Sequence, residues 1–515
     1  MQRFDVIVIG AGSSGGVVAA RLTENPDCRV LLLEAGPDFP REEEIPPLFT
    51  VSGEHSWKTA AIPEFDWDFF NADRAGTLNG RRLWLPRGRL MGGTSMVNAT
   101  IAARGAPFDF DRWAGMGAEG WAWDDVLPFF IRIENDLDFG GEPIHGDSGP
   151  IVIQRYKPES WAPVNRIMYE ACVELGIREA PDLNGLDAHA GVVGAMPHNR
   201  YKEVRLGTLV TYIRQARKRP NLTIKAGAIA DRILLRGETA EGVAFVDAHG
   251  THTAYADEIV VSAGVYNTPA ILQRSGIGPS EWLEPLGIRT VADLPVGKNL
   301  LDHPGFGMIF RGDGVGVTTG RSFVADIRGP AGPNGEPAWQ THPFPVDEEE
   351  GLAGFWTYLT HALAQGEVTV RSADPREAPM IDHRYNTVES DRQNFDDARS
   401  FCKEMLAAGA FARRNAAWVD DINQPIAEAL SQRMGAAHHQ CGTARIGAAG
   451  DPAAVVGPDL RVHGFANLRV ADTSVYPDNV QHNTNLTALV VGERAAEFVA
   501  ASLGTRNATP ARMSA

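Results

Sequence analysis

A glycine motif near the amino terminus constrains this chain more than any other feature. An apolar run at residues 6–9 leads directly into Gly10-x-Gly12-x-x-Gly15, and a stretch rich in alanine and valine follows. A second apolar run ends at the acid Glu34. Gly10 allows a tight turn, Gly12 lets the backbone approach a pyrophosphate, and Gly15 lets the helix pack close to the strand. We therefore predict a β-α-β unit that binds a dinucleotide at the amino terminus of its helix.

The length and composition describe a large folded protein. With 515 residues the chain exceeds one ordinary hydrophobic core, so we expect two or three lobes. Hydrophobic residues make up 43% and charged residues 22%, as is typical of a globular protein. The formal net charge of −17 argues against binding to nucleic acid. The 4 cysteines form no Cys-x-x-Cys pair, which argues against a disulfide framework or a zinc ribbon.

The distribution of apolar residues bears on the location of the protein. No apolar run approaches the roughly 18–20 residues of a membrane span. The first predicted strand begins at residue 4, which leaves no room for a signal peptide before it. We therefore expect a cytoplasmic protein without a membrane span.

Segments far along the chain are predicted to return to the amino-terminal unit. A strand-rich block begins at residues 221–225 and ends in a buried strand that is followed by Gly264. A later strand ends at the acid Asp472, and a long helix follows at 487–503. Ligands of α/β sheets lie at the carboxyl ends of strands, which is where these segments are predicted to meet. A cofactor domain assembled from such distant segments makes wide contacts with its ligand, and this favours a permanently held FAD. Exchangeable NAD is the alternative. Residues 86–98 form a second glycine-centred turn, which is predicted to enter a helix of small residues.

Three motifs resemble signatures of the glucose–methanol–choline (GMC) family of FAD oxidoreductases. Residues 86–98 resemble the first family signature, residues 264–279 resemble the second, and residues 294–303 match the motif that follows it. The resemblance covers almost the whole chain. It implies an α/β fold with a Rossmann-like FAD domain assembled from discontinuous segments, and an α+β substrate domain with an antiparallel sheet. The implied ranges are 1–105, 205–305 and 456–515 for the FAD domain, and 106–204 and 306–455 for the substrate domain.

The resemblance also implies which residues hold the cofactor. Gly10, Gly12, Gly15 and Glu34 would hold the ADP half, the backbone of Ala230 would meet the adenine, and Asp472 would lie near the pyrophosphate and ribityl chain. The complete implied set is Gly10, Gly12, Ser13, Ser14, Gly15, Glu34, Ala35, Met91, Gly92, Asn98, Ala99, Ala230, Gly264, Asp472, Asn483 and Thr484. Some relatives attach FAD covalently through a histidine one residue before Asn98. Here that residue is Val97, which implies non-covalent FAD.

Two carboxyl-terminal residues are implied to carry the chemistry. His439 matches the family histidine that precedes a Gly-Thr pair, and Asn483 matches a position that holds His or Asn. Oxidation of an alcohol removes a hydroxyl proton and a carbon-bound hydride. A histidine titrates near neutral pH and is therefore a suitable base for the proton, while FAD accepts the hydride at flavin N5. Asn483 would orient the alcohol oxygen and stabilise the developing alkoxide charge.

Other residues near these motifs are candidates for the substrate pocket. His438 is predicted to be a pocket-wall or structural residue, because neighbours in an extended chain point to opposite sides. His482 is predicted to be flavin-adjacent or to stand at a helix entry. Trp356 and Tyr358 belong to an alternating run that lines the pocket or forms an ordinary packed strand. The histidines form no HxH or HxxxH set, so we expect no metal.

These observations predict an FAD-dependent alcohol oxidoreductase that acts on a primary alcohol, with aromatic and furanic alcohols as candidates. The reduced flavin would pass its electrons to O2 or to a quinone or carrier protein, between which the sequence does not decide. The alternative enzyme is a hydroxynitrile lyase that contains FAD but performs no net redox chemistry. A non-catalytic FAD-binding protein is the remaining alternative.

Overall fold

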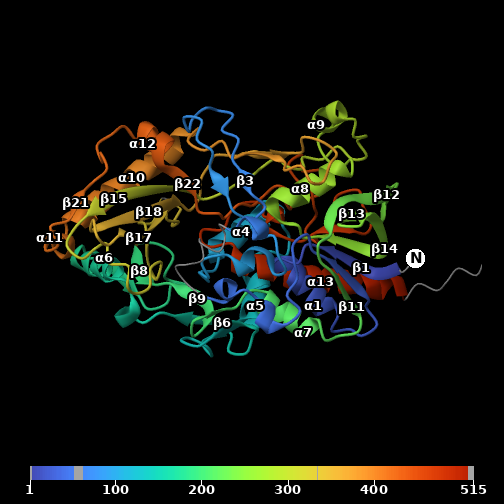
Figure 1. Cartoon of the computed structure of the whole chain (residues 1–515), viewed down its shortest axis with the longest axis horizontal. Helices are drawn as coiled ribbons and strands as arrows, with labels where there is room; N and C mark the ends of the chain where they lie inside the picture. Colours follow the sequence, from blue (N-terminus) through green and yellow to red (C-terminus); the bar gives the residue numbers. More distant parts are fainter. Residues whose placement is uncertain (1–2, 52–61, 333, 508–515) are drawn as a thin grey trace, which may run out of the picture.

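A computed structural model describes residues 3–51, 62–332 and 334–507. Two large sheets dominate it, and Figure 1 shows one toward the right of the view and the other toward the left. Each sheet has its own large cluster of buried hydrophobic side chains. The fold is thus mixed α/β, with the Rossmann-like sheet and the separate antiparallel sheet that the sequence predicted.

The first sheet brings the two ends of the chain together. Its strand order is β11-β2-β1-β14-β13-β12, and β23 also pairs with β14. The central strands are parallel, whereas β12, β13 and the start of β14 pair antiparallel. The strands are β1 (Arg3–Ile9), β2 (Val30–Leu33), β11 (Leu222–Lys225), β12 (Ile229–Arg236), β13 (Thr239–Asp247), β14 (Gly250–Val261) and β23 (Leu468–Val470).

The register of the parallel strands aligns their carboxyl ends. Ile9 pairs with Leu33 on one side and with Val261 on the other, and Val261 pairs in turn with Val470. The loops after these four strands therefore leave the sheet along one edge. That edge is where ligands of parallel α/β sheets bind.

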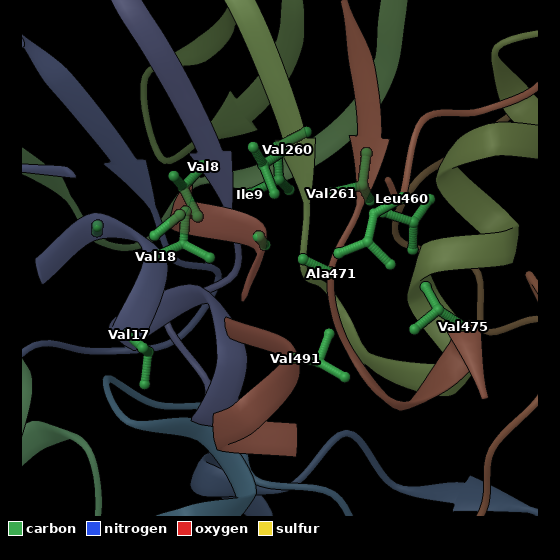
Figure 2. Packing of buried hydrophobic residues seen from close by; sticks show 14 of the residues in the cluster. Val8, Ile9, Val17, Val18, Val260, Val261, Leu460, Ala471, Val475 and Val491 are labelled. Carbon is green, nitrogen blue, oxygen red and sulfur yellow. The ribbon is translucent and has the colours of Figure 1, made fainter. Parts of the chain in front are cut away.

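Helices α1 (Ser13–Leu22) and α13 (Asn485–Asn507) pack together against this sheet. Figure 2 shows Val17 and Val18 of α1 and Val491 of α13 among the buried side chains below the strands. The two helices approach closely because Gly492 has no side chain, and a Cβ there would lie 2.7 Å from the carbonyl oxygen of Ser14. The first helix and the last helix of the fold are therefore in direct contact.

The second sheet forms the opposite lobe. Its strand order is β21-β15-β18-β17-β16-β8-β7, with β22 paired to β15, and all of its pairs are antiparallel except β7 with β8. The strands are β7 (Arg178–Ala180), β8 (Val192–Ala195), β15 (Pro304–Arg311), β16 (Ala325–Arg328), β17 (Trp339–Asp347), β18 (Leu352–Leu359), β21 (Ala417–Trp418) and β22 (Met434–Ala436). The helices whose side chains join its core include α6 (Pro163–Glu174), α10 (Glu389–Ala407), α11 (Gly409–Ala412) and α12 (Ile426–Arg433).

In the described part of the chain, the remaining strands belong to three smaller sheets, β10-β9-β6-β5, β19-β20 and β3-β4. The remaining strands are β3 (Phe69–Phe70), β4 (Trp84–Leu85), β5 (Glu134–Asp136), β6 (Ile151–Arg155), β9 (Pro197–Tyr201), β10 (Val204–Arg205), β19 (Glu367–Thr369) and β20 (Met380–Asp382). The remaining α-helices are α2 (Pro47–Thr50), α4 (Pro107–Gly115), α5 (Trp123–Ile133), α7 (Arg214–Ala216), α8 (Gly264–Arg274) and α9 (Ser280–Leu283). Among the described residues, no helix combines the length and the apolar character that crossing a membrane requires.

The small-residue helix expected after the second glycine turn does not form. Only one 3-10 turn, Gly93–Met96, follows Gly92. Gly92 and Gly93 have φ angles of 91° and 53°, a left-handed conformation that an α-helix cannot contain. The turn instead packs on the first glycine motif, where a Cβ at Gly93 would lie 2.8 Å from the Cα of Gly12.

The domain ranges implied by the sequence remain a prediction. Trp113 of α4 and Phe130 of α5 lie in the predicted substrate domain, but both belong to the core of the first sheet. Residues 508–515 of the predicted FAD domain lie outside the described residues.

Candidate active site

A cavity of about 650 Å³ extends from the carboxyl edge of the first sheet to the face of the second. Gly10, Glu34 and Asp472 line it at the first sheet, and Trp356 and Tyr358 line it at the second. Residues that are hundreds of positions apart in the sequence thus share one wall.

The first glycine motif forms the turn between β1 and α1. Gly10 has a φ of 95°, and a Cβ there would lie 2.3 Å from the carbonyl oxygen of Ser262, so only glycine fits. The buried carboxylate of Glu34 accepts hydrogen bonds from the backbone N–H groups of Ala11 (2.9 Å) and Gly36 (2.8 Å). Burial raises the pKa of Glu34 to about 7, although these hydrogen bonds oppose the shift. Glu34 therefore holds two loops in place, namely the glycine turn after β1 and the loop that follows β2.

Asp472 has a similar organising role at the far side of β14. Its carboxylate accepts hydrogen bonds from the N–H of Gly264 (2.9 Å), the hydroxyl of Thr268 (2.6 Å) and the N–H of Ser474 (2.8 Å). Burial raises its pKa, and these hydrogen bonds oppose the shift. One carboxylate thus links the end of β23 to the first turn of α8.

His439 and Asn483 meet on the cavity wall. The Asn483 side-chain nitrogen lies 3.0 Å from Nε2 of His439, and both residues line the cavity. The other ring nitrogen of His439, Nδ1, lies 2.8 Å from Nδ1 of His303. His303 is fully buried, and its ring stacks on Tyr358 with centroids 5.5 Å apart. His439 therefore presents Nε2 to the cavity and Nδ1 to the protein interior.

The backbone of His439 is also held from two sides. Its N–H donates to Asp302 (2.9 Å), and its carbonyl accepts from the side chain of Asn479 (3.3 Å). Asp302 additionally accepts from Tyr385 and from Gln440. Burial raises the pKa of Asp302 to about 6 against these hydrogen bonds. The base candidate is consequently fixed by side chain and by main chain.

Electrostatics keep the His439 imidazole neutral. Burial lowers its pKa well below the ordinary value of 6.5, and the nearby His303, His438 and Arg87 lower it further. A neutral imidazole has a free nitrogen lone pair, so His439 can accept a proton near neutral pH.

The other two predicted histidines occupy different environments. His438 lines the cavity with an exposed side chain and a φ of 65°, and its carbonyl accepts a hydrogen bond from Arg87. His482 does not line the cavity. It is buried, with Nδ1 lying 3.0 Å from the side-chain oxygen of Gln340 and its ring stacked near His189.

The second sheet contributes an aromatic wall. Trp356 and Tyr358 of β18 line the cavity, whereas Phe355, which directly precedes Trp356, lies in the hydrophobic core on the other face. The alternating run at this position is thus both a pocket wall and a packed strand. His342 and Phe344 of β17 and the nearby Phe323 extend the wall.

Sequence reasoning missed several residues of this site, namely His303, Asp302, Arg87, Tyr266, Phe323, His342 and Phe344. Asp302 and His303 are the last two residues of the third family motif, so that motif could have indicated them as site residues. His342 and Phe344 occupy alternate positions of their strand, as Trp356 and Tyr358 do. Alternation alone does not indicate which face of the strand lines the cavity.

A second cluster of titratable groups lies away from the cavity lining. Glu134, Asp136 and His145 stand close enough together to hold a metal ion. Two buried guanidinium groups already bind these carboxylates, since Arg104 pairs with Glu134 and Arg155 pairs with Asp136. The cluster is a network of ion pairs.

Comparison with known proteins assigns the family. The two sequence models for GMC oxidoreductases match residues 4–305 and 362–492. The chain belongs to the GMC oxidoreductase family. As an FAD-dependent member, it acts on CH–OH groups.

Named relatives span nearly the whole chain. Over 96% of its length this GMC oxidoreductase is 33% identical to the oxygen-dependent choline dehydrogenase of Brucella suis biovar 1 (strain 1330), of which 95% is covered. It is 32% identical, also over 96%, to the 5-(hydroxymethyl)furfural oxidase of Methylovorus sp. (strain MP688), of which 98% is covered. The crystal structure of pyridoxine 4-oxidase from Mesorbium loti superposes with a TM-score of 0.87 at 29% identity and covers 96% of this chain and 99% of that one.

The cavity of this GMC oxidoreductase fits FAD. A Cβ at Gly12 or at Gly264 would meet no protein atom within 4 Å, so a ligand can approach the bare backbone at both positions. The first residues of α1, α8 and α13 all line the cavity, and helix amino termini attract phosphate groups.

The predicted cofactor residues fall into two groups. Most line the cavity: Gly10, Gly12, Ser13, Ser14, Glu34, Ala35, Asn98, Ala99, Ala230, Gly264, Asp472, Asn483 and Thr484. Gly15, Met91 and Gly92 are buried behind this lining. A Cβ at Gly15 would lie 2.0 Å from the carbonyl oxygen of Gly10, and the N–H of Gly92 donates to the carbonyl of Ala11 (3.0 Å). Gly15 and Gly92 thus shape the first glycine loop from behind.

Proposed function

We propose that this GMC oxidoreductase oxidises a primary alcohol on an aromatic or furanic ring to the carbonyl compound. One observation carries the proposal: the cavity wall presents Nε2 of a neutral, buried histidine beside the amide of Asn483, at a separation of 3.0 Å. The printed names of two relatives, 5-(hydroxymethyl)furfural oxidase and pyridoxine 4-oxidase, agree with a ring-bearing substrate.

His439 acts as the general base. An alcohol is too weak an acid to ionise in neutral water, so its hydroxyl proton must pass to a positioned acceptor. Nε2 of His439 receives this proton, while His303 and Asp302 hold the ring and the backbone in place. When bound, FAD supplies the hydride acceptor for the carbon-bound hydrogen.

Asn483 positions the alcohol. Its side-chain N–H groups are hydrogen-bond donors, and they lie beside the nitrogen that takes the proton. A donor directed at the alcohol oxygen favours the alkoxide character that develops as the proton leaves. The aromatic wall excludes water from the same space, which strengthens both interactions.

We further propose that FAD is held without a covalent bond to residue 97. Val97 lines the cavity and has no nucleophilic atom. Acid precipitation should therefore release all of the flavin into the supernatant. Flavin that stays with the precipitate would contradict this proposal.

Anaerobic flavin reduction tests the function directly. The holoenzyme is mixed with benzyl alcohol, 5-(hydroxymethyl)furfural, pyridoxine or choline, and bleaching of the flavin absorbance is followed. We expect bleaching by a ring-bearing alcohol. The reduced enzyme is then offered O2 and a quinone to identify its electron acceptor. Release of cyanide from mandelonitrile, with no alcohol able to bleach the flavin, would instead identify a lyase.

The matched variants are His439→Ala and His252→Ala. Removal of a general base slows the chemical step by about 10²- to 10⁴-fold, so His439→Ala should bind FAD but bleach slowly. His252 lies in the early part of β14, where its side chain is hydrogen-bonded to Asp247. It does not line the cavity. Its variant should bleach at the wild-type rate. Equal rates for wild type and His439→Ala would remove His439 from this role.

A further inference from the structure

The indole of Trp356 packs against three glycines, Gly305, Gly307 and Gly435. A Cβ at Gly305 would lie 2.1 Å from Cζ2 of the indole, and a Cβ at Gly435 would lie 2.8 Å from Cη2. At Gly307 the nearest ring atom would be 3.6 Å away. Separations below 3.0 Å do not occur between such atoms, so the ring can occupy this position only because residues 305 and 435 are glycine.

Sheet register explains how the glycines come together. Gly307 pairs directly with Trp356, which pairs with His342 on its other side. Gly305 pairs with Tyr358 and with Gly435 of β22. Directly paired residues project on the same face of a sheet, so the glycines and the aromatic side chains share the face that lines the cavity. The glycines leave a depression in that face, and the indole fills it.

Trp356 lies next to Tyr358 on the face that lines the cavity. The ring of Tyr358 lies beside the ring of His439, with centroids 5.8 Å apart. Trp356 stands two residues earlier on the same strand, so its backbone is about 7 Å further along the same face. Its indole leans back over Gly305, the residue that pairs with Tyr358. The indole of Trp356 and the imidazole of His439 thus line the same cavity, with Tyr358 beside both.

A second pair of rings continues the wall on the other side of Trp356. The rings of Phe344 and Phe323 are stacked, with centroids 6.3 Å apart and an angle of 5° between their planes. Phe344 also lies over a glycine, since a Cβ at Gly354 would be 2.6 Å from its Cζ. Aromatic rings seated on glycines thus form this end of the cavity.

We propose that Trp356 determines which alcohols this enzyme accepts. Its indole is the stacking surface for a single flat ring, and it occupies the space that a larger fused ring system would need. The proposal deepens the proposed alcohol oxidation and rests on it. It assigns substrate size selection to one side chain and to the glycines beneath it.

Two substitutions with opposite effects test the proposal in the FAD-loaded enzyme. The measured quantity is the limiting rate of anaerobic flavin reduction divided by the dissociation constant of the alcohol, for benzyl alcohol and for 2-naphthalenemethanol. Trp356→Ala removes the stacking surface and opens the pocket, so the ratio of the bicyclic to the monocyclic value should rise about tenfold or more. Gly305→Ala leaves Trp356 in place but pushes the indole into the cavity, so the same ratio should fall.

Two further variants secure the interpretation. Trp356→Phe retains an aromatic face with less bulk and should give an intermediate ratio, even if the alanine variant fails to fold. Trp339→Phe is the matched control. Trp339 pairs with Leu359 in the same sheet, is buried and does not line the cavity, so its variant should keep the wild-type ratio.

The outcomes separate the two proposals. A ratio that is unchanged in both Trp356→Phe and Gly305→Ala would overturn the role of Trp356 while alcohol oxidation stands. The proposed function itself would be overturned if neither of these alcohols, nor any other ring-bearing alcohol, reduces the flavin of the wild-type holoenzyme.

Discussion

The Nδ1 atoms of His303 and His439 lie 2.8 Å apart in the protein interior. At this distance one nitrogen donates a hydrogen and the other accepts it, because two N–H groups cannot point at each other. His439 needs a free lone pair on Nε2 to act as a base, so its own hydrogen must sit on Nδ1 and point to His303. When His303 accepts this hydrogen, His439 is held in the tautomer in which Nε2 faces the cavity unprotonated.

Replacement of His303 should impair flavin reduction without loss of FAD. In His303→Ala the Nδ1 hydrogen of His439 has no acceptor, so the unproductive tautomer becomes populated. We expect the limiting rate of flavin reduction to fall by about 10- to 100-fold, the size that is typical for loss of an orienting partner of a functional histidine. Stopped-flow absorbance at saturating alcohol measures this rate.

The conservative variant His303→Asn serves as the control. An asparagine carbonyl can accept the same hydrogen, so this variant should recover part of the lost rate and a pH profile closer to wild type. A wild-type rate in His303→Ala, or an equal loss in both variants, would show that the contact does not orient His439.

The pH dependence of flavin reduction follows from the pKa of His439. In the proposed mechanism the neutral form is the base, so activity exists above this pKa and is lost as pH falls through it. Because burial and the neighbouring basic side chains lower the pKa of His439, the acid limb should lie below 6.5. The limiting reduction rate, measured from pH 5 to 9, should be constant at neutral pH. An acid limb above pH 6.5 would contradict this assignment.

The local β-α-β unit could be predicted from the sequence because its determinants are adjacent residues. Gly10, Gly12 and Gly15 act within one turn, and the structure places the strand and helix around them as expected. The helix predicted after Gly92 was wrong for an equally local reason. Small residues are compatible with a helix, but the composition does not reveal that two consecutive glycines take left-handed φ angles.

The contacts that complete the site depend on tertiary structure. His303 and His439 stand 136 residues apart, and no periodicity predicts that their rings meet. Trp356 and Phe355 are neighbours with the same apolar character, and only the packing of β18 decides which of them faces the cavity. A family resemblance transfers matched positions such as His439. It does not indicate the glycines that seat Trp356, because these come from β15 and β22.

Substitution by alanine should affect two glycines of the first motif differently, with FAD affinity lowered at Gly12 and stability lowered at Gly15. In Gly12→Ala the new methyl group meets no protein atom but points into the cavity, so stability without FAD should be unchanged. We expect FAD affinity to fall roughly 10- to 100-fold, because the backbone no longer admits the ligand. Fluorescence titration of the apoprotein with FAD measures the affinity.

In Gly15→Ala the methyl group would lie 2.0 Å from the carbonyl oxygen of Gly10, inside the packed turn. Such overpacking costs about 1–3 kcal/mol, so this variant should unfold at a lower temperature even without FAD. If Gly12→Ala lowers apoprotein stability as much as Gly15→Ala does, the division between a ligand-facing and a packing glycine is wrong.

A final prediction concerns the ion-pair network behind β5. His145 donates toward Glu134 (3.1 Å) and Asp182 (3.0 Å), and its side chain is fully buried. Burial lowers the pKa of His145, but the hydrogen bonds to Asp182 and Glu134 outweigh it and raise the pKa to about 9. The network then holds three buried cations, namely His145, Arg104 and Arg155. The carboxylates that pair with them are Glu134, Asp136, Asp182 and the less buried Asp138.

Because the folded pKa of His145 lies above its ordinary value of 6.5, its charge stabilises the fold fully below pH 6.5. This contribution declines above pH 6.5 and is lost as pH rises through about 9. We expect His145→Gln to lower the unfolding free energy by about 3 kcal/mol near neutral pH and by much less at pH 10. Thermal unfolding of the holoenzyme at both pH values measures the difference from wild type. A difference that stays constant from pH 7 to pH 10 would show that His145 contributes packing and hydrogen bonds but no charge.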